Sequence, residues 1–160
     1  MPNILVIGYG NELRSDDGLG PKIAAAIEQE HMAGVQVITA HQLTPELAEP
    51  ISAADAVIFI DAAIQRLDRV KGEGLDPSVV VRVLSPGGVG SPEAQFRAHG
   101  NTPELLMGLA VRLFGKCPPG WSITVPAADF GFGETLSASA QAAVPLALLK
   151  FQELWRSLSA

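Results

Sequence analysis

An apolar run that ends in glycines and leads directly into two acidic residues places the tightest constraint on how this chain can fold. Residues 4–8 are Ile-Leu-Val-Ile-Gly, and such a run is typical of a central strand in a parallel sheet that is covered on both faces. Asp16 and Asp17 lie in the loop that follows. Pro21 then favours the start of a helix, because proline suits the first helical turn. This order predicts the first strand–loop–helix unit of an α/β fold.

The rest of the chain continues this alternation of short apolar runs and longer helical patterns. Leu105, Leu109 and Leu113 recur at helical spacing, and we expect them to form one buried face. The sequence therefore predicts one domain over residues 1–160, with a doubly wound α/β fold whose mostly parallel, twisted five-stranded sheet is flanked by helices. The later elements that we predict are strands at 35–39, 57–60, 79–84 and 121–125, helices at 21–30, 44–51, 102–117 and 137–158, and loops at 66–77 and 85–101.

The composition excludes several classes of function. The formal net charge of -6 argues against binding to nucleic acid, which requires a basic surface. No apolar run approaches the roughly 18 residues of a transmembrane helix, and the run at 4–7 lacks the length and the basic flank of a signal peptide. One cysteine, Cys117, rules out an internal disulfide. We therefore expect a monomeric cytoplasmic protein that binds neither nucleic acid nor membranes.

The first turn does not have the pattern of a nucleotide-binding loop. Leu13 stands where the dinucleotide fingerprint needs its third glycine, and the strand at 35–39 leads to His41 rather than to an acid that could hold a ribose. Two carboxylates at a phosphate site would also repel the phosphates. The chain has neither a P-loop nor the G-x-S-x-G motif of a serine hydrolase.

Acidic residues and a histidine follow three different predicted elements at one edge of the sheet. Asp61 comes directly after the strand at 57–60, and His99 lies in the loop at 85–101. Together with Asp17 they make a mixed oxygen and nitrogen set that suits a divalent ion such as nickel, zinc or manganese and leaves positions open for substrate. The alternative is structural, since acids before a helix stabilise its positive end and an aspartate can cap a turn.

Two other side chains have open roles. His41 follows the strand at 35–39 on the same sheet edge, so it either reaches the site or belongs to the surface. Cys117 is either a nucleophile or a small packed residue, and its position at a predicted helix end favours packing.

The chain resembles the nickel–iron hydrogenase maturation endopeptidases over essentially its whole length. The most specific part is the segment 4–11, Ile-Leu-Val-Ile-Gly-Tyr-Gly-Asn, followed by Asp-Asp-Gly-Leu-Gly at 16–20. Asp61-Ala62, His99 before a leucine-rich helix, and the glycine-rich segment 130–137 support it in order and spacing. The resemblance implies a twisted, largely parallel sheet between helices. It also implies an endopeptidase that removes a carboxy-terminal extension from the hydrogenase large subunit after nickel insertion.

Carried over by position, the resemblance implies roles for individual residues. Asp17, Asp61 and His99 would bind a nickel ion, and Asp17 and Asp61 would be catalytic. The nickel is expected to be carried by the large-subunit precursor, which is then the partner, rather than held as a resident cofactor. Asp16 is expected to hold the loop or to cap the helix that follows it.

Two other functions remain open from the sequence. A protease of related fold, such as a spore-germination protease, would use the same carboxylates on another substrate. A nickel carrier without enzymatic activity would use the same ligands.

Overall fold

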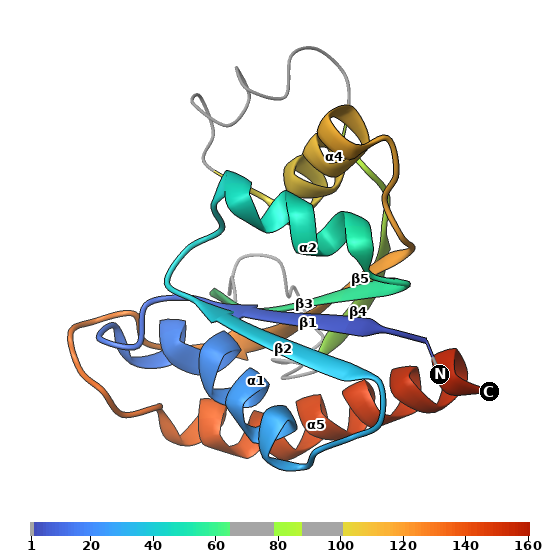
Figure 1. Ribbon diagram of the computed structural model, residues 1–160. Helices are drawn as coiled ribbons and strands as arrows, with labels where there is room; N and C mark the ends of the chain where they lie inside the picture. Colours follow the sequence, from blue (N-terminus) through green and yellow to red (C-terminus); the bar gives the residue numbers. More distant parts are fainter. Residues whose placement is uncertain (1, 65–78, 88–100) are drawn as a thin grey trace, which may run out of the picture.

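The computed structural model describes residues 2–64, 79–87 and 101–160, and in them five strands form one sheet in the order β2-β1-β3-β5-β4 (Figure 1). Neighbouring strands run parallel except at one edge, where β4 is antiparallel to β5. The strands are β1 (Ile4–Tyr9), β2 (Val35–Ala40), β3 (Ala56–Ile64), β4 (Val80–Leu84) and β5 (Gly120–Ala127).

Helices cover both faces of the sheet. Figure 1 shows α1 and α5 on one face and α2 and α4 on the other. No helix among the described residues is long and apolar enough to cross a membrane. The helical elements are η1 (Ser15–Gly18), α1 (Leu19–Gln29), η2 (Pro45–Leu47), α2 (Ala48–Ala53), α4 (Pro103–Phe114) and α5 (Ala138–Ser159), of which η1 and η2 are 3-10 turns.

The sheet order creates a switch point between β1 and β3. The chain leaves β1 through α1 and reaches β2 on one side, then crosses back through α2 to β3 on the other side of β1. In open α/β sheets of this kind, ligands bind at the carboxyl ends of the strands where the order reverses. A ligand site is therefore expected at the carboxyl ends of β1 and β3.

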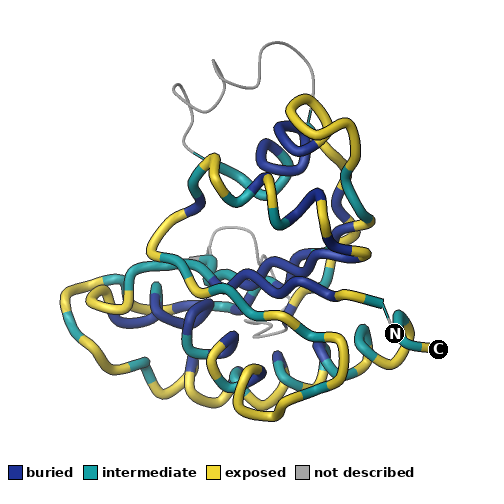
Figure 2. Tube along the Cα trace, viewed as in Figure 1, coloured by how far each residue is buried: buried dark blue, intermediate teal, exposed yellow. Residues whose placement is uncertain are grey.

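Each face of the sheet has its own apolar core. Because side chains alternate along a strand, Ile4, Val6 and Ile58 pack beneath α1 and α5, whereas Leu5, Ile7 and Phe59 pack against α2 and α4. Figure 2 shows these central strands as the buried interior of the molecule. A strand that is buried on both faces explains the continuous apolar run at 4–8.

The predicted fold class is confirmed, but the end of one strand and the burial of one leucine differ from the prediction. Strand β3 runs to Ile64, so Asp61 lies within a strand that still pairs with β5 rather than directly after it. The prediction that Leu113 is buried with Leu105 and Leu109 is wrong. Leu113 is 58% exposed because it lies in the last turn of α4. The predicted loops at 66–77 and 85–101 fall mostly outside the described residues.

Two glycines allow α1 to approach the ends of β1 and β3. A Cβ at Gly20 would lie 2.4 Å from the carbonyl oxygen of Tyr9 and 2.5 Å from that of Ile60. A Cβ at Gly8 would lie 2.3 Å from the carbonyl oxygen of Gly20. Real Cβ atoms do not come this close to backbone atoms, so the helix touches the switch point only because both residues lack a side chain.

Replacing Gly20 by alanine should therefore destabilise the protein. Alanine stabilises an ordinary helix position by about 1 kcal/mol relative to glycine, whereas overpacking against rigid backbone lowers the free energy of unfolding by about 1–3 kcal/mol. Urea denaturation should therefore give a lower free energy of unfolding for Gly20→Ala than for the wild type. A variant more stable than the wild type would show that α1 does not press against these carbonyl groups.

Candidate functional site

The candidate site begins where β1 and β3 stop pairing with each other. Their shared register ends at Gly8 opposite Ile60, while β3 continues its pairing with β5. Tyr9 and Asp61 are the next residues on the two strands, and the Tyr9 hydroxyl donates a hydrogen bond of 2.9 Å to Oδ2 of Asp61. This bond connects the two strands just beyond their ladder.

Asp61 is a partly buried carboxylate among polar neighbours. Burial raises its pKa above the ordinary value, although hydrogen bonds from the Tyr9 and Thr124 hydroxyls and the positive charge of Arg82 act in the opposite direction. The negative charge of Glu104, in the first turn of α4, adds to the rise in the pKa. The hydroxyls of Tyr9 and Thr124 are neutral donors to Asp61, and together with Arg82 they only partly offset the desolvation of its charge.

Asp17 lies in the turn η1, between β1 and α1, and is partly exposed. Its Oδ2 accepts a hydrogen bond of 2.8 Å from the backbone N–H of Asn11. The loop closes tightly here, since a Cβ at Gly10 would lie 1.9 Å from the backbone oxygen of Asp17, and the φ of 145° at Gly10 also favours glycine. The loop thus fixes Asp17 at the carboxyl end of β1.

Asp16 has a different role from its neighbour. Its side chain is fully buried and accepts hydrogen bonds from the backbone N–H groups of Ala128, Asp129 and Ser137 and from the Ser137 hydroxyl, at 2.7–3.0 Å. Burial alone would raise its pKa, but these hydrogen bonds lower it below the usual value of 3.8. Asp16 therefore anchors the loop after β1 to the segment between β5 and α5.

The prediction that Asp16 holds the loop is confirmed, and the alternative that it caps the following helix is wrong. Gly18 occupies the position before α1 and no side chain caps that helix. The helix that Asp16 supports is α5, because Ser137, its N-cap, accepts from Ala140 N while donating to Asp16.

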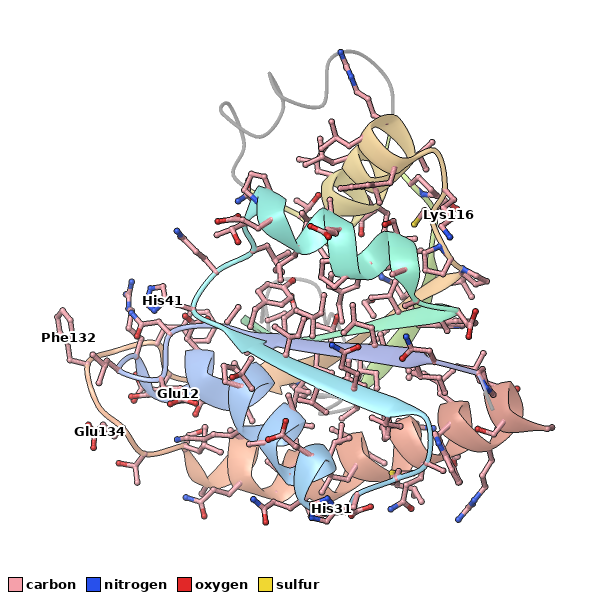
Figure 3. All side chains as sticks on the ribbon, viewed as in Figure 1. Glu12, His31, His41, Lys116, Phe132 and Glu134 are labelled. Atoms are coloured by element: carbon pink, nitrogen blue, oxygen red, sulfur yellow. The ribbon has the colours of Figure 1, made fainter. Side chains whose placement is uncertain are left out.

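Further hydrogen bonds fasten the same two loops together. Ser15 adopts a φ of 52°, and its N–H and hydroxyl donate to the carbonyl oxygens of Gly133 and Gly131. Gly133 N–H donates in return to the carbonyl oxygen of Leu13. Phe132, which is 97% exposed, lies at the outer tip of this clamped loop and points away from the sheet (Figure 3).

A cavity of about 200 Å³ lies beside Asp61, between the sheet and the start of α4. Ser122, which is only 4% exposed, lines it, and the structure gives its hydroxyl no hydrogen-bond partner. The lining is mostly polar: Tyr9, Asp61, Arg82, Asn101, Thr102, Pro103, Glu104, Ser122 and Thr124. A polar cavity of this kind can hold water or part of a peptide.

The structure brings Asp17 and Asp61 to the same end of the sheet but does not test the predicted three-ligand site. The charges of both aspartates raise the pKa of the Tyr9 phenol, so both act on the same group. His99 lies outside the described residues. Within the described ranges, no three His, Cys, Asp or Glu side chains are grouped closely enough to hold a metal ion. The set of Asp17, Asp61 and His99 stays a prediction.

His41 and Cys117 lie elsewhere. His41 is exposed and lines a cavity of about 330 Å³ beside Gly10 and Leu13, separate from the cavity at Asp61. Cys117 is half-buried, burial raises its pKa, and its neighbour Lys116 lies on the opposite side of the molecule from His41 (Figure 3). A raised pKa disfavours the nucleophilic thiolate, which supports the packing interpretation.

The amino-acid sequence did not indicate that Asp61 has Tyr9, Thr124 and Glu104 as neighbours. Tyr9 carried a usable signal, because it continues the alternation of Leu5 and Ile7 on one face of β1. Glu104 resembled an ordinary acid in the first turn of a helix. Only the packing of α4 over the sheet brings it to this site.

Comparisons with known proteins support the fold. No protein-family model and no curated protein matches the chain. The hydrogenase maturating endopeptidase HybD from E. coli matches with a TM-score of 0.69 and 22% identity, over 97% of this chain and 93% of that one. HybD from Thermococcus kodakarensis gives 0.67 and 21% over 95% and 98%, and the maturation protease HycI from T. kodakarensis KOD1 gives 0.64 and 21% over 92% and 89%. At these identities the likeness establishes a shared fold.

Asp16 and Asp61 should respond differently to neutralisation. Asp16→Asn loses hydrogen bonds from buried donors to a charged acceptor, and we expect it to lower the free energy of unfolding by about 3 kcal/mol. Asp61→Asn removes a charge that burial disfavours and keeps an acceptor for Tyr9, so its stability should stay within about 1 kcal/mol of the wild type. Urea denaturation at neutral pH measures both.

The effect at Asp16 should depend on pH. Because its pKa is lowered on folding, ionised Asp16 stabilises the protein above about pH 4, and this contribution is lost as the pH falls through the lowered pKa. The difference in unfolding free energy between wild type and Asp16→Asn should therefore shrink below about pH 4. A difference that stays constant down to pH 2 would contradict this account.

Proposed function

We propose that this protein is an endopeptidase that removes the carboxy-terminal extension of a nickel–iron hydrogenase large-subunit precursor. The observation that carries the proposal is the pair Asp17 and Asp61, fixed at the switch point of a fold shared with proteins named as hydrogenase maturation endopeptidases. The sequence motifs around both aspartates lead to the same family independently of the fold.

In this proposal the nickel belongs to the substrate. Asp17, Asp61 and His99 supply three ligands, and the precursor supplies the others, so that only a nickel-loaded precursor docks productively. Oxygen and imidazole ligands with open positions suit such a shared ion. Asp61 fits this role because its charge is not cancelled by an ion pair in the described part of the chain.

Peptide hydrolysis also needs activation of a water molecule. An aspartate carboxylate can take a proton from water as the water attacks the scissile carbonyl, and a bound metal ion can polarise that carbonyl. We assign the base to one of the two aspartates. The polar cavity beside Asp61 gives room for water and for the peptide at this position.

Removing either aspartate should abolish processing while leaving the fold intact. With purified nickel-loaded precursor, the wild type should reduce the precursor mass by that of the extension, as measured by mass spectrometry. Asp17→Asn and Asp61→Asn should process it at least 100-fold more slowly, on the order of what a lost catalytic base costs. His99→Ala should fail similarly.

Cys117→Ser is the matched control, since Cys117 lies away from this site, and it should process the precursor at the wild-type rate. Loss of cleavage in Cys117→Ser with retention in Asp17→Asn would indicate a thiol peptidase. A precursor that wild-type protein leaves unchanged in mass would favour a nickel carrier, and cleavage of an unrelated protein instead would favour another protease of this fold.

Metal binding by the isolated protein should be weak and should depend on the same residues. Three ligands without those of the precursor are expected to bind added nickel, zinc or cadmium only modestly, and Asp17→Asn should weaken binding at least about tenfold. Isothermal titration calorimetry measures this. Stoichiometric nickel that survives dialysis of the purified protein would contradict the shared-ion model and support a carrier.

A further inference from the structure

The hydrogen bond from Tyr9 to Asp61 directly links side chains of the two strands at the switch point. The Tyr9 hydroxyl lies 2.9 Å from Oδ2 of Asp61. The phenol ring is partly buried and packs against the apolar core beneath α2 and α4, which includes Ile7 and Phe59. Because a packed aromatic ring has little freedom, the direction of its hydroxyl is set by the core rather than by solvent.

The Tyr9 hydroxyl acts as the donor in this bond. A tyrosine phenol ordinarily has a pKa of about 10, so it is protonated at neutral pH. A protonated phenol donates one hydrogen bond, and an ionised carboxylate can only accept.

A neutral donor suits a carboxylate that must still bind something else. A carboxylate has about four lone-pair positions, and the hydroxyls of Tyr9 and Thr124 bond to it without adding charge. A lysine or arginine in direct contact would instead neutralise the carboxylate and compete with a cation. Arg82 acts on Asp61 through its charge, and no ion pair between the two is formed in the described structure.

We propose that Tyr9 is a positioning residue, whose hydroxyl fixes the orientation of the Asp61 carboxylate so that its remaining lone pairs are presented to the metal ion of the substrate. This inference rests on the proposed function and deepens it. It assigns to the motif Gly8-Tyr9-Gly10, at the end of β1, a role in the site beyond the close packing that its glycines allow.

A purely structural role for Tyr9 predicts a different result. If the residue served only to fill the core, Tyr9→Phe would keep the ring and behave as the wild type. Trp155→Phe is the control, because it keeps an aromatic ring but removes one hydrogen bond of a partly buried side chain, from Trp155 Nε1 to the carbonyl oxygen of Ala33 before β2. That bond lies at the amino end of the strands, opposite the site.

The test measures three quantities: thermal stability, cadmium affinity by calorimetry, and the rate of processing of nickel-loaded precursor. The proteins compared are the wild type, Tyr9→Phe, Trp155→Phe, Asp61→Asn and the double variant Tyr9→Phe/Asp61→Asn. We expect Tyr9→Phe to lower cadmium affinity and processing each about tenfold, while Trp155→Phe stays within twofold of the wild type. The double variant should bind cadmium as weakly as Asp61→Asn alone, because Tyr9 acts through the carboxylate.

A spectroscopic signal adds a readout that does not depend on activity. In protein labelled with carbon-13 at aspartate carboxyl groups, the Asp61 resonance should shift in Tyr9→Phe and remain in place in Trp155→Phe. An unshifted resonance together with wild-type affinity and rate in Tyr9→Phe overturns the positioning role and leaves the proposed function standing. A wild-type protein that does not process the precursor overturns the proposed function itself.

Discussion

The buried carboxylate of Asp16 is the interaction on which the arrangement of the site depends. Its four hydrogen bonds join the loop after β1 to the segment between β5 and α5. Without them, three backbone N–H groups and a hydroxyl in this region would lose their acceptor. Buried donors without a hydrogen-bond partner lower the stability of the folded state. Because Asp16 is held inside, the adjacent Asp17 is carried to the end of β1, where it bonds to Asn11.

Two aspartates in this protein, Asp16 and Asp61, show how the environment gives one type of side chain two different roles. Asp16 is surrounded by donors that favour its charge, so ionisation stabilises the fold. Asp61 is partly buried, and the donors around it do not fully offset the desolvation of its charge, so its pKa is raised. Residues that bind ligands often show this second pattern, since the missing partner is the ligand itself.

The sequence was sufficient to predict the sheet and the presence of Asp17 and Asp61 at one edge of it, because strand periodicity and the rule for parallel sheets act locally. It was not sufficient to identify the hydrogen-bond partners of Asp16, which lie 112–121 residues away. Leu113 was wrongly predicted to be buried, because helical spacing does not show where a helix extends beyond the elements on which it packs. Tyr9 was missed because alternation indicates the face of a strand but not which group a hydroxyl will meet.

The long separation between Asp16 and its donors has a consequence for biosynthesis. Chains emerge from the ribosome amino end first, and elements fold as their partners become available. Strand β1 and helix α1 leave the ribosome early, but the anchor for the loop between them is completed only by Ser137, close to the start of the last helix. Thus a nascent chain that already contains Asp16 and Asp17 cannot complete this anchor until the segment before α5 has been made.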